Sequence, residues 1–136
     1  MVVKFVWHNS PAIWIGSIYG FAKNRFDTVV QGEQKVLLED IQCFFGKQLK
    51  KDDMVIMTGD FNSVGNFGDD QGDHMETWAA GLGLKHGYRL WQDLHRTDGS
   101  LYTHRQVIAG GMMTETHIDH IWVSLNVGPH VVSSSQ

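Results

Sequence analysis

A glycine, a carboxylate and an amide follow an apolar run near the middle of the chain, in the sequence Gly59-Asp60-Phe61-Asn62. Residues 54–58 predict a buried strand, and Gly59 would allow a sharp exit at its carboxyl end. Side chains two residues apart on extended backbone point the same way, so Asp60 and Asn62 would project side by side. A hard cation with a phosphate, or a water about to attack one, suits this pair of oxygen-bearing side chains. The alternative is a plain turn, because Gly, Asp and Asn all favour turns.

A second carboxylate, Asp119, lies in a segment whose residues alternate between two faces, as in a strand. The alternation over residues 117–123 separates two sets: Ile118, His120 and Trp122 on one face, and Asp119, Ile121 and Val123 on the other. A carboxylate among apolar neighbours is costly unless it is paired, hydrogen-bonded or bound to a metal. If this strand neighbours the one before Asp60, then Asp60, Asn62 and Asp119 converge. Such a group could position Mg²⁺ and orient a water toward a phosphodiester.

Histidine and cysteine offer other metal chemistry. His117 and His120 flank Asp119, but residues three apart on a strand point to opposite faces, which disfavours a zinc ion held by both. Their other roles are hydrogen bonding behind a site, or packing. Cys43 is the only cysteine, so an intramolecular disulfide is excluded and a cysteine-based zinc site is disfavoured. We expect Cys43 to be a small packed residue of a helix.

The net charge of −4 argues against a protein that binds nucleic acid through a broad basic surface. Any phosphate substrate must then be held locally, with metal ions offsetting charge at the site. One part of the chain concentrates basic residues and is a candidate phosphate contact, although scattered surface charge explains them equally well: Lys85, Arg89, Arg96 and Arg105. No apolar run approaches transmembrane length, and the first residues do not resemble a signal peptide.

The length of 136 residues and the 42% hydrophobic content predict one domain, residues 1–136. Two apolar segments, residues 2–7 and 12–19, flank a turn and predict a β-hairpin. Helical spacing of apolar residues predicts helices over residues 33–51 and 74–81. The other expected elements are loops over residues 21–32, 66–73 and 107–115, a short strand over residues 101–104, and a last strand starting at residues 130–132.

Four motifs of the chain occur in the order found in the endonuclease/exonuclease/phosphatase superfamily, the DNase I-like nucleases. They are Tyr19 at a strand end, Gly59-Asp60-Phe61-Asn62, Tyr102-Thr103 and Thr116-His117-Ile118-Asp119-His120-Ile121. Residues 90–96 also resemble the segment that precedes the Tyr-Thr strand in that family. The similarity covers nearly the whole chain, and the chain particularly resembles the endonuclease domains of non-LTR retrotransposons.

The resemblance implies a four-layer α/β/β/α sandwich and Mg²⁺-dependent hydrolysis of phosphodiesters, with Mn²⁺ as a substitute metal and DNA as the substrate. By position, Asp60 would orient or deprotonate the attacking water, and Asn62 would help to hold the phosphate and the metal. Asp119 would act on the metal directly or through water, and Tyr19 would contact the scissile phosphate. Without the family, a half-buried aromatic is the simpler interpretation of Tyr19. The resemblance also implies an intracellular protein, nuclear if it belongs to a retroelement, with no membrane partner.

The chain departs from the family pattern at both ends. The family's metal-binding Glu and an active-site Asn would lie before residue 1, and its Ser-Asp-His motif would follow residue 136. The Asn expected after the strand-end Tyr is displaced, with Ala22 at its place and Asn24 nearby. We therefore expect a partial domain, incomplete at both termini and weak or inactive in hydrolysis by itself. Exposed sheet edges in such a domain would favour self-association.

Two other functions fit the same residues. One is a non-catalytic remnant or interaction module that keeps only the fold. The other keeps the hydrolase chemistry but takes a phosphate monoester or a lipid headgroup, because substrate choice in such sites lies in loops. The arginines between residues 89 and 105 favour nucleic acid slightly.

Overall fold

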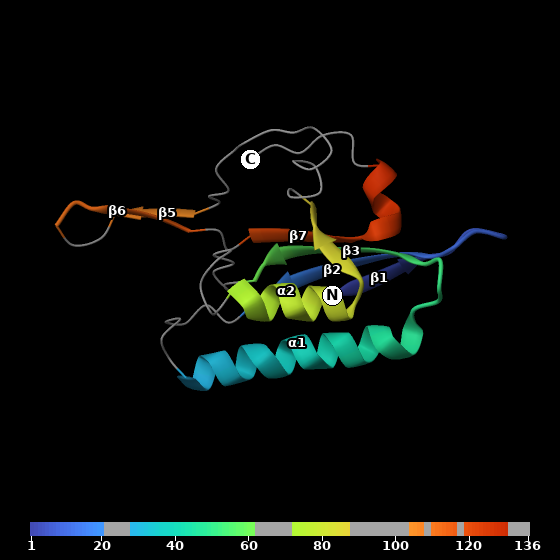
Figure 1. The fold of residues 1–136 in the computed structure, drawn as a ribbon, viewed down its shortest axis with the longest axis horizontal. Coiled ribbons are helices and arrows are strands. Elements are labelled where there is room, and N and C mark those ends of the chain that lie inside the picture. The colour runs from blue at the N-terminus through green and yellow to red at the C-terminus, as the bar shows by residue number, and fades with distance from the viewer. Residues whose placement is uncertain (21–27, 62–71, 88–103, 108–109, 117–118, 131–136) are drawn as a thin grey trace.

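The computed structural model describes residues 1–20, 28–61, 72–87, 104–107, 110–116 and 119–130, and it interleaves strands with helices (Figure 1). In order the elements are β1 (Val2–Phe5), β2 (Ile13–Tyr19), α1 (Thr28–Gln48), β3 (Met54–Asp60), α2 (Gly72–Gly81), β4 (Leu84–His86), β5 (His104–Val107), β6 (Met113–Thr116), β7 (Asp119–Ser124) and a 3₁₀ helix, η1 (Leu125–His130). The predicted α/β class is confirmed. Within these residues, no helix is long and apolar enough to cross a membrane.

Five strands form one mixed sheet in the order β1-β2-β3-β7-β4. β2 and β3 pair in parallel, whereas the β1–β2, β3–β7 and β4–β7 pairs are antiparallel. Parallel neighbours need a long crossover, and α1 lies in that connection. β5 and β6 form a separate two-stranded hairpin that projects from the body (Figure 1).

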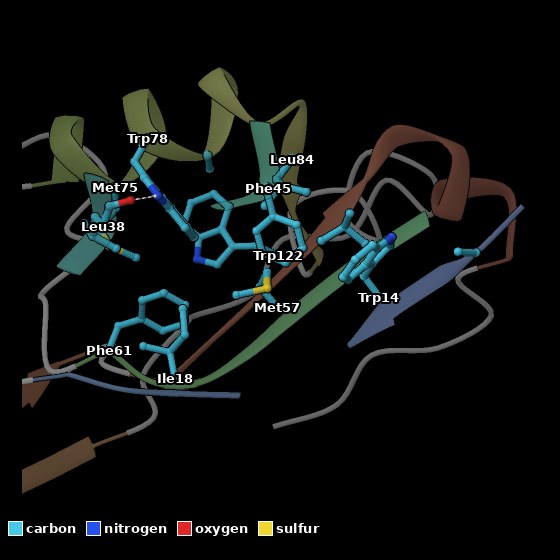
Figure 2. Close-up of a cluster of buried hydrophobic side chains, with 13 residues drawn as sticks. Trp14, Ile18, Leu38, Phe45, Met57, Phe61, Met75, Trp78, Leu84 and Trp122 are labelled. Carbon is cyan, nitrogen blue, oxygen red and sulfur yellow. Dashed lines mark hydrogen bonds between the residues drawn. The ribbon is translucent and has the colours of Figure 1, made fainter. Parts of the chain in front are cut away.

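The helices α1 and α2 both cover one face of the five-stranded sheet, and the core lies between them and the strands (Figure 1). Inward positions alternate along β2, as with Trp14 and Ile18. The indole N–H of Trp78 on α2 donates a 2.8 Å hydrogen bond to the carbonyl oxygen of Leu38 on α1, which ties the two helices together (Figure 2). The buried cluster comprises Ala12, Trp14, Ile18, Leu38, Phe45, Val55, Met57, Phe61, Met75, Trp78, Ala79, Leu84 and Trp122.

The opposite face of the sheet carries apolar side chains that remain accessible. Val3 is 40% exposed, Phe5 43%, Ile15 38% and Ile121 50%. Val3 pairs with Ile15 in register, so the two side chains lie together on this face. No described α-helix covers it (Figure 1). The predicted self-association through exposed sheet edges stays a prediction.

One buried aspartate fastens the amino end of β3. Asp53 is 8% exposed and accepts hydrogen bonds from the backbone N–H of Ala12 (3.1 Å), the indole N–H of Trp14 (2.9 Å) and the backbone N–H of Lys50 (3.2 Å). Burial would raise the pKa of Asp53, but these hydrogen bonds and the nearby charge of Lys4 bring its pKa below the ordinary value. The carboxylate therefore ties β2, β3 and the segment after α1 into one unit.

The predicted hairpin and both predicted helices are confirmed, with shifted ends. The first helix, α1, was expected over residues 33–51 but runs from Thr28 to Gln48. Part of the expected loop over residues 21–32 is therefore helical. The second helix, expected over residues 74–81, begins at Gly72. Helix boundaries move because capping and tertiary packing, and not periodicity alone, decide where the first and last turns lie.

Some local predictions are wrong. The expected loop over residues 107–115 contains the end of β5 and most of β6, which pair as a hairpin through Gly110 and Gly111 at positive φ. The expected last strand does not include residue 130, because His130 ends η1, and residues 131–132 lie outside the described part of the chain. Cys43 is exposed and not packed, since α1 turns Leu38 and Phe45 into the core instead. Of the strand expected over residues 101–104, His104 lies in β5 (His104–Val107), while residues 101–103 lie outside the described part of the chain.

Candidate functional site

Three of the predicted site residues form a row across adjacent strands at one end of the sheet. The β2–β3 register sets Tyr19 beside Asp60, and the β3–β7 register sets Asp60 beside Asp119. Residues paired directly across neighbouring strands point to the same face, with Cβ atoms about 4.5–5.5 Å apart in an antiparallel pair. The strands that carry the two carboxylates are therefore neighbours, as the sequence predicts, and they bring Asp60 and Asp119 together.

This row lies on the face of the sheet away from the helices, where its side chains reach solvent. Tyr19 is 74% exposed, Asp119 is exposed and Asp60 is partly exposed. The half-buried interpretation of Tyr19 is wrong, because the side chain stands on the uncovered face. His120, next to Asp119, points the other way and is 1% exposed, which confirms the predicted alternation along β7. Both carboxylates are accessible to water and to a ligand.

Two glycines allow the backbones to approach closely beneath the row. Gly59 lies inside β3 with a φ of +140°, and a Cβ there would lie 1.9 Å from the carbonyl oxygen of Ile18. The N–H of Gly20 donates a 2.7 Å hydrogen bond to the carbonyl oxygen of Asp60, and a Cβ on Gly20 would lie 2.0 Å from the carbonyl oxygen of Phe61. The expected exit from β3 at Gly59 is therefore wrong: the strand continues to Asp60, and the glycine is needed for a close contact with β2.

Aromatic side chains support the row from the buried face. Phe61 follows Asp60, is fully buried, and meets the ring of His120 edge to face with centroids 5.5 Å apart. Phe61 also meets Trp78 of α2 with centroids 6.0 Å apart, and its carbonyl oxygen accepts a 3.1 Å hydrogen bond from Nε2 of Gln34. The residues that follow Asp60 and Asp119 thus contact each other behind the two carboxylates.

His120 also makes a polar contact. Its Nδ1 lies 3.2 Å from Nε2 of His86 on β4, and His86 is 5% exposed. His86 was not among the residues predicted for the site. The signal was present in Leu84-Lys85-His86, where the alternation buries the histidine on the same face as the leucine.

Asp60 and Asp119 are the residues of the row that could hold a metal ion. The described residues contain no group of three or more His, Cys, Asp or Glu side chains that could hold a metal. Two carboxylates nevertheless suit Mg²⁺, because this ion keeps several waters and binds through one or two carboxylates together with substrate phosphates. Their placement in register on an accessible face fits such an ion.

The remaining predicted site residues lie outside the described part of the chain. They are Asn62, which was expected beside Asp60, and His117, Tyr102 and Thr103 of the other motifs. Arg89 and Arg96 of the basic segment lie outside it too. Their roles stay predictions from the sequence.

Solved structures with a similar backbone identify the fold. A protein from Leptotrichia buccalis C-1013-b, described as an endonuclease/exonuclease/phosphatase family protein, matches 92% of this chain with a TM-score of 0.58 and 16% identity. D. rerio TDP2, solved with a single-strand DNA product, matches 90% of it with a TM-score of 0.57 and 15% identity. Staphylococcus aureus beta toxin matches 92% with a TM-score of 0.54 and 11% identity. The chain shares their fold.

The chain spans 42–45% of the length of these three structures. No protein-family model matches it, and no curated protein does. The resemblance to the endonuclease/exonuclease/phosphatase superfamily is confirmed for the fold, because structures of that family are among its neighbours. The closer likeness to retrotransposon endonucleases stays a prediction, and the function of this chain must be argued from its own residues.

Proposed function

We propose that the chain carries part of a metal-dependent phosphodiesterase site, with DNA as the substrate. The observation that carries this proposal is the row of Tyr19, Asp60 and Asp119 on three adjacent strands, with two carboxylates in register on an accessible face. The fold that the chain shares with endonuclease/exonuclease/phosphatase proteins supports it. A pair of accessible carboxylates is suited to a cation and a phosphate.

Each residue of the row has a role that its position supports. Asp60 is central, and its carboxylate can hold a water and accept a proton from it. Tyr19 lies on one side of Asp60 and can donate its phenol hydrogen bond to a phosphate oxygen. Asp119 lies on the other side and, with Asn62, would complete the oxygen ligands for Mg²⁺ or Mn²⁺. A bound ion would offset the charge of the phosphate and lower the pKa of a coordinated water.

The nucleic-acid substrate and the retroelement origin rest on the order of the sequence motifs. The chain has a net charge of −4, so binding would depend on local contacts with the phosphates and not on a broad positive surface. The TDP2 structure contains a single-strand DNA product, which shows that this fold accommodates DNA in that protein. A phosphate monoester or a lipid headgroup would use the same row, so the choice of substrate needs its own measurement.

We also propose a four-layer sandwich in which a second sheet covers the face away from the helices at Val3, Phe5 and Ile15 and leaves the carboxylate row open at the end of the strands. Val3, Phe5 and Ile15 lie exposed there, as expected for a face that packs against another layer. The similar structures are more than twice as long as the matched region, which leaves room for such a sheet. Further groups of the site would then come from that sheet, and this chain alone would be weak or inactive.

Nicking of a supercoiled plasmid in the presence of Mg²⁺ tests the proposed function. We expect slow nicking that EDTA abolishes and that Asp60→Asn or Asp119→Asn lowers by about 10²- to 10³-fold, the usual cost of losing one group that stabilises the transition state. Asp52→Asn is the matched control, since Asp52 is an exposed aspartate beside the other end of β3. Nicking that survives in both site variants would contradict the proposal, and robust nicking that needs Asp60 would contradict the expected weakness.

The non-catalytic remnant is the second candidate, and one observation favours it. Two carboxylates alone gather in the row, and the described residues hold no larger metal-binding group. If the chain does not nick DNA, calorimetry with Mn²⁺ separates the two functions. Binding that Asp60→Asn abolishes would indicate a metal site without turnover, whereas absent binding or binding that the variant leaves unchanged would indicate a remnant.

A further inference from the structure

Among the described residues, the hydrogen-bonded pairing between β4 and β7 ends before the carboxylate row. The register pairs Leu84 with Ser124, Lys85 with Val123 and His86 with Trp122. His86 is the last residue of β4, and Asp119 precedes its partner Trp122 by three residues at the start of β7. The β3–β7 ladder pairs Asp119 with Asp60 on one side of β7, whereas on the other side the described part of the β4 ladder reaches only as far as Trp122.

A side-chain contact continues where this ladder ends. His86 lies opposite Trp122 and reaches diagonally to His120, two residues closer to Asp119, with Nε2 and Nδ1 3.2 Å apart. Diagonal neighbours on one face of a sheet are separated by about 7–8 Å, a gap that two aromatic rings can span. One nitrogen donates and the other accepts, so the bond fixes the orientation of both rings.

Aromatic rings surround the His86–His120 pair and connect it to Phe61, the residue that follows Asp60. Trp122 packs against His86 with centroids 5.0 Å apart and stacks on His120 at 6.0 Å. On its other side, His120 meets Phe61, the residue that follows Asp60. The buried rings of His86 on β4, His120 on β7 and Phe61 just after β3 therefore contact one another in series. They lie on the face of the sheet opposite the carboxylate row.

We infer that His86 is a positioning residue for the two carboxylates, acting through His120. By holding the start of β7 against β4, the histidine bond keeps Asp119 beside Asp60 on the opposite face. This inference rests on the proposed metal site. Geometry at such a site must be held within about 0.5 Å, which packing alone secures less well than packing joined to a directional hydrogen bond. Groups that orient metal ligands typically change metal affinity by about 10- to 100-fold, and one that acts through a neighbour should have a smaller effect.

A matched pair of substitutions separates the hydrogen bond from the shape of the side chain. Gln places its amide near the position of Nε2 of His86, and Met has the same length without a strong donor or acceptor. We expect His86→Gln to keep the dissociation constant for Mn²⁺ within about twofold of the unsubstituted chain, and His86→Met to raise it about three- to tenfold. EPR titration of free Mn²⁺ gives both values, and urea denaturation of the same samples gives their stability.

Two controls make the outcomes distinct. Asp119→Asn should weaken Mn²⁺ binding by more than about tenfold, and Trp14→Phe, which removes a hydrogen bond to Asp53 at the far end of the sheet, should lower stability without changing affinity. If Asp119→Asn has no effect, the proposed site fails and the inference fails with it. If Asp119→Asn weakens binding but His86→Met does not, or if Gln and Met weaken it equally, the role of His86 is overturned while the site stands. Should His86→Met not fold, His86→Asn, whose shorter amide falls short of His120, replaces it with the same expected weakening.

Discussion

One aspartate precedes β3 and another ends it, and the molecule uses the two carboxylates in opposite ways. Asp53, before the strand, is 8% exposed and accepts three hydrogen bonds from neighbouring segments. Asp60, the last residue of the strand, faces the accessible side and lies in register with a second carboxylate, Asp119. An aspartate therefore holds neighbouring segments together at the amino end of β3, whereas at the carboxyl end an aspartate lies beside a second carboxylate.

The difference teaches how to separate a structural carboxylate from a chemical one. A buried carboxylate with several N–H donors stabilises the fold, because its charge is satisfied only in the native state. Like charges directly opposite each other across two strands are destabilising, and the proposed cation would offset that repulsion between Asp60 and Asp119. Sequence position alone does not distinguish them, since both aspartates adjoin the same apolar strand.

The largest expected effect concerns the backbone at the carboxyl end of β3. Gly59→Ala should lower the free energy of unfolding by about 4 kcal/mol, because it combines a disfavoured φ with a Cβ that collides with backbone. The collision is with the carbonyl oxygen of Ile18, 1.9 Å away. Urea denaturation measures the loss. Gly46→Ala in α1 is the control: no atom lies within 4 Å of its added Cβ, and it should stabilise the chain by about 0.5–1 kcal/mol. Equal effects of the two would show that the carboxyl end carries no backbone constraint.

The next effect concerns the amino end. Asp53→Ala should lower the free energy of unfolding by about 3 kcal/mol, because it removes three hydrogen bonds to a charged acceptor and leaves buried donors unpaired. Asp52→Ala changes the exposed neighbour and should stay within about 0.5 kcal/mol of the unsubstituted chain. Chemical denaturation of both variants measures the difference. A small effect of Asp53→Ala would remove the contrast between the two ends of β3.

The smallest effect is a dependence of that stability on pH. The pKa of Asp53 in the folded chain lies below its ordinary value of 3.8, so its contribution is complete above pH 3.8 and is lost as the pH falls through the folded-state pKa. The stability difference between the unsubstituted chain and Asp53→Asn should therefore be constant from about pH 7 to about pH 4 and shrink below that. Denaturation at a series of pH values gives this curve. A difference that does not change between about pH 4 and the lowest pH with cooperative unfolding would show that the carboxylate is not held in its charged form.

Local patterns predicted much of the fold. Alternation identified the amino-terminal hairpin and placed His120 and Trp122 together on one face of β7, and helical spacing identified α1 and α2. The β5–β6 hairpin was missed because its glycines and methionines hide the alternation. Cys43 was misplaced because the choice of the buried side of α1 depends on the neighbours that Leu38 and Phe45 meet, which a single helix does not reveal.

The candidate site divides in the same way. Residue chemistry and motif order singled out Tyr19, Asp60, Asn62 and Asp119. Strand patterns placed Tyr19 at the end of one strand and Asp119 within another. Which strands become neighbours, and in which register, was open. A shift of one residue between β3 and β7 would send Asp119 to the other face from Asp60.

The sequence by itself therefore determined the α/β class, most of the elements and the residues able to bind a cation or a phosphate, because side-chain type and periodicity are local properties. Tertiary structure decided that Tyr19, Asp60 and Asp119 stand in one row. It also showed that Asp53 is a buried anchor, and that His86 reaches His120 behind the row. These facts depend on strand order and register, which arise from long-range packing of segments far apart in the chain.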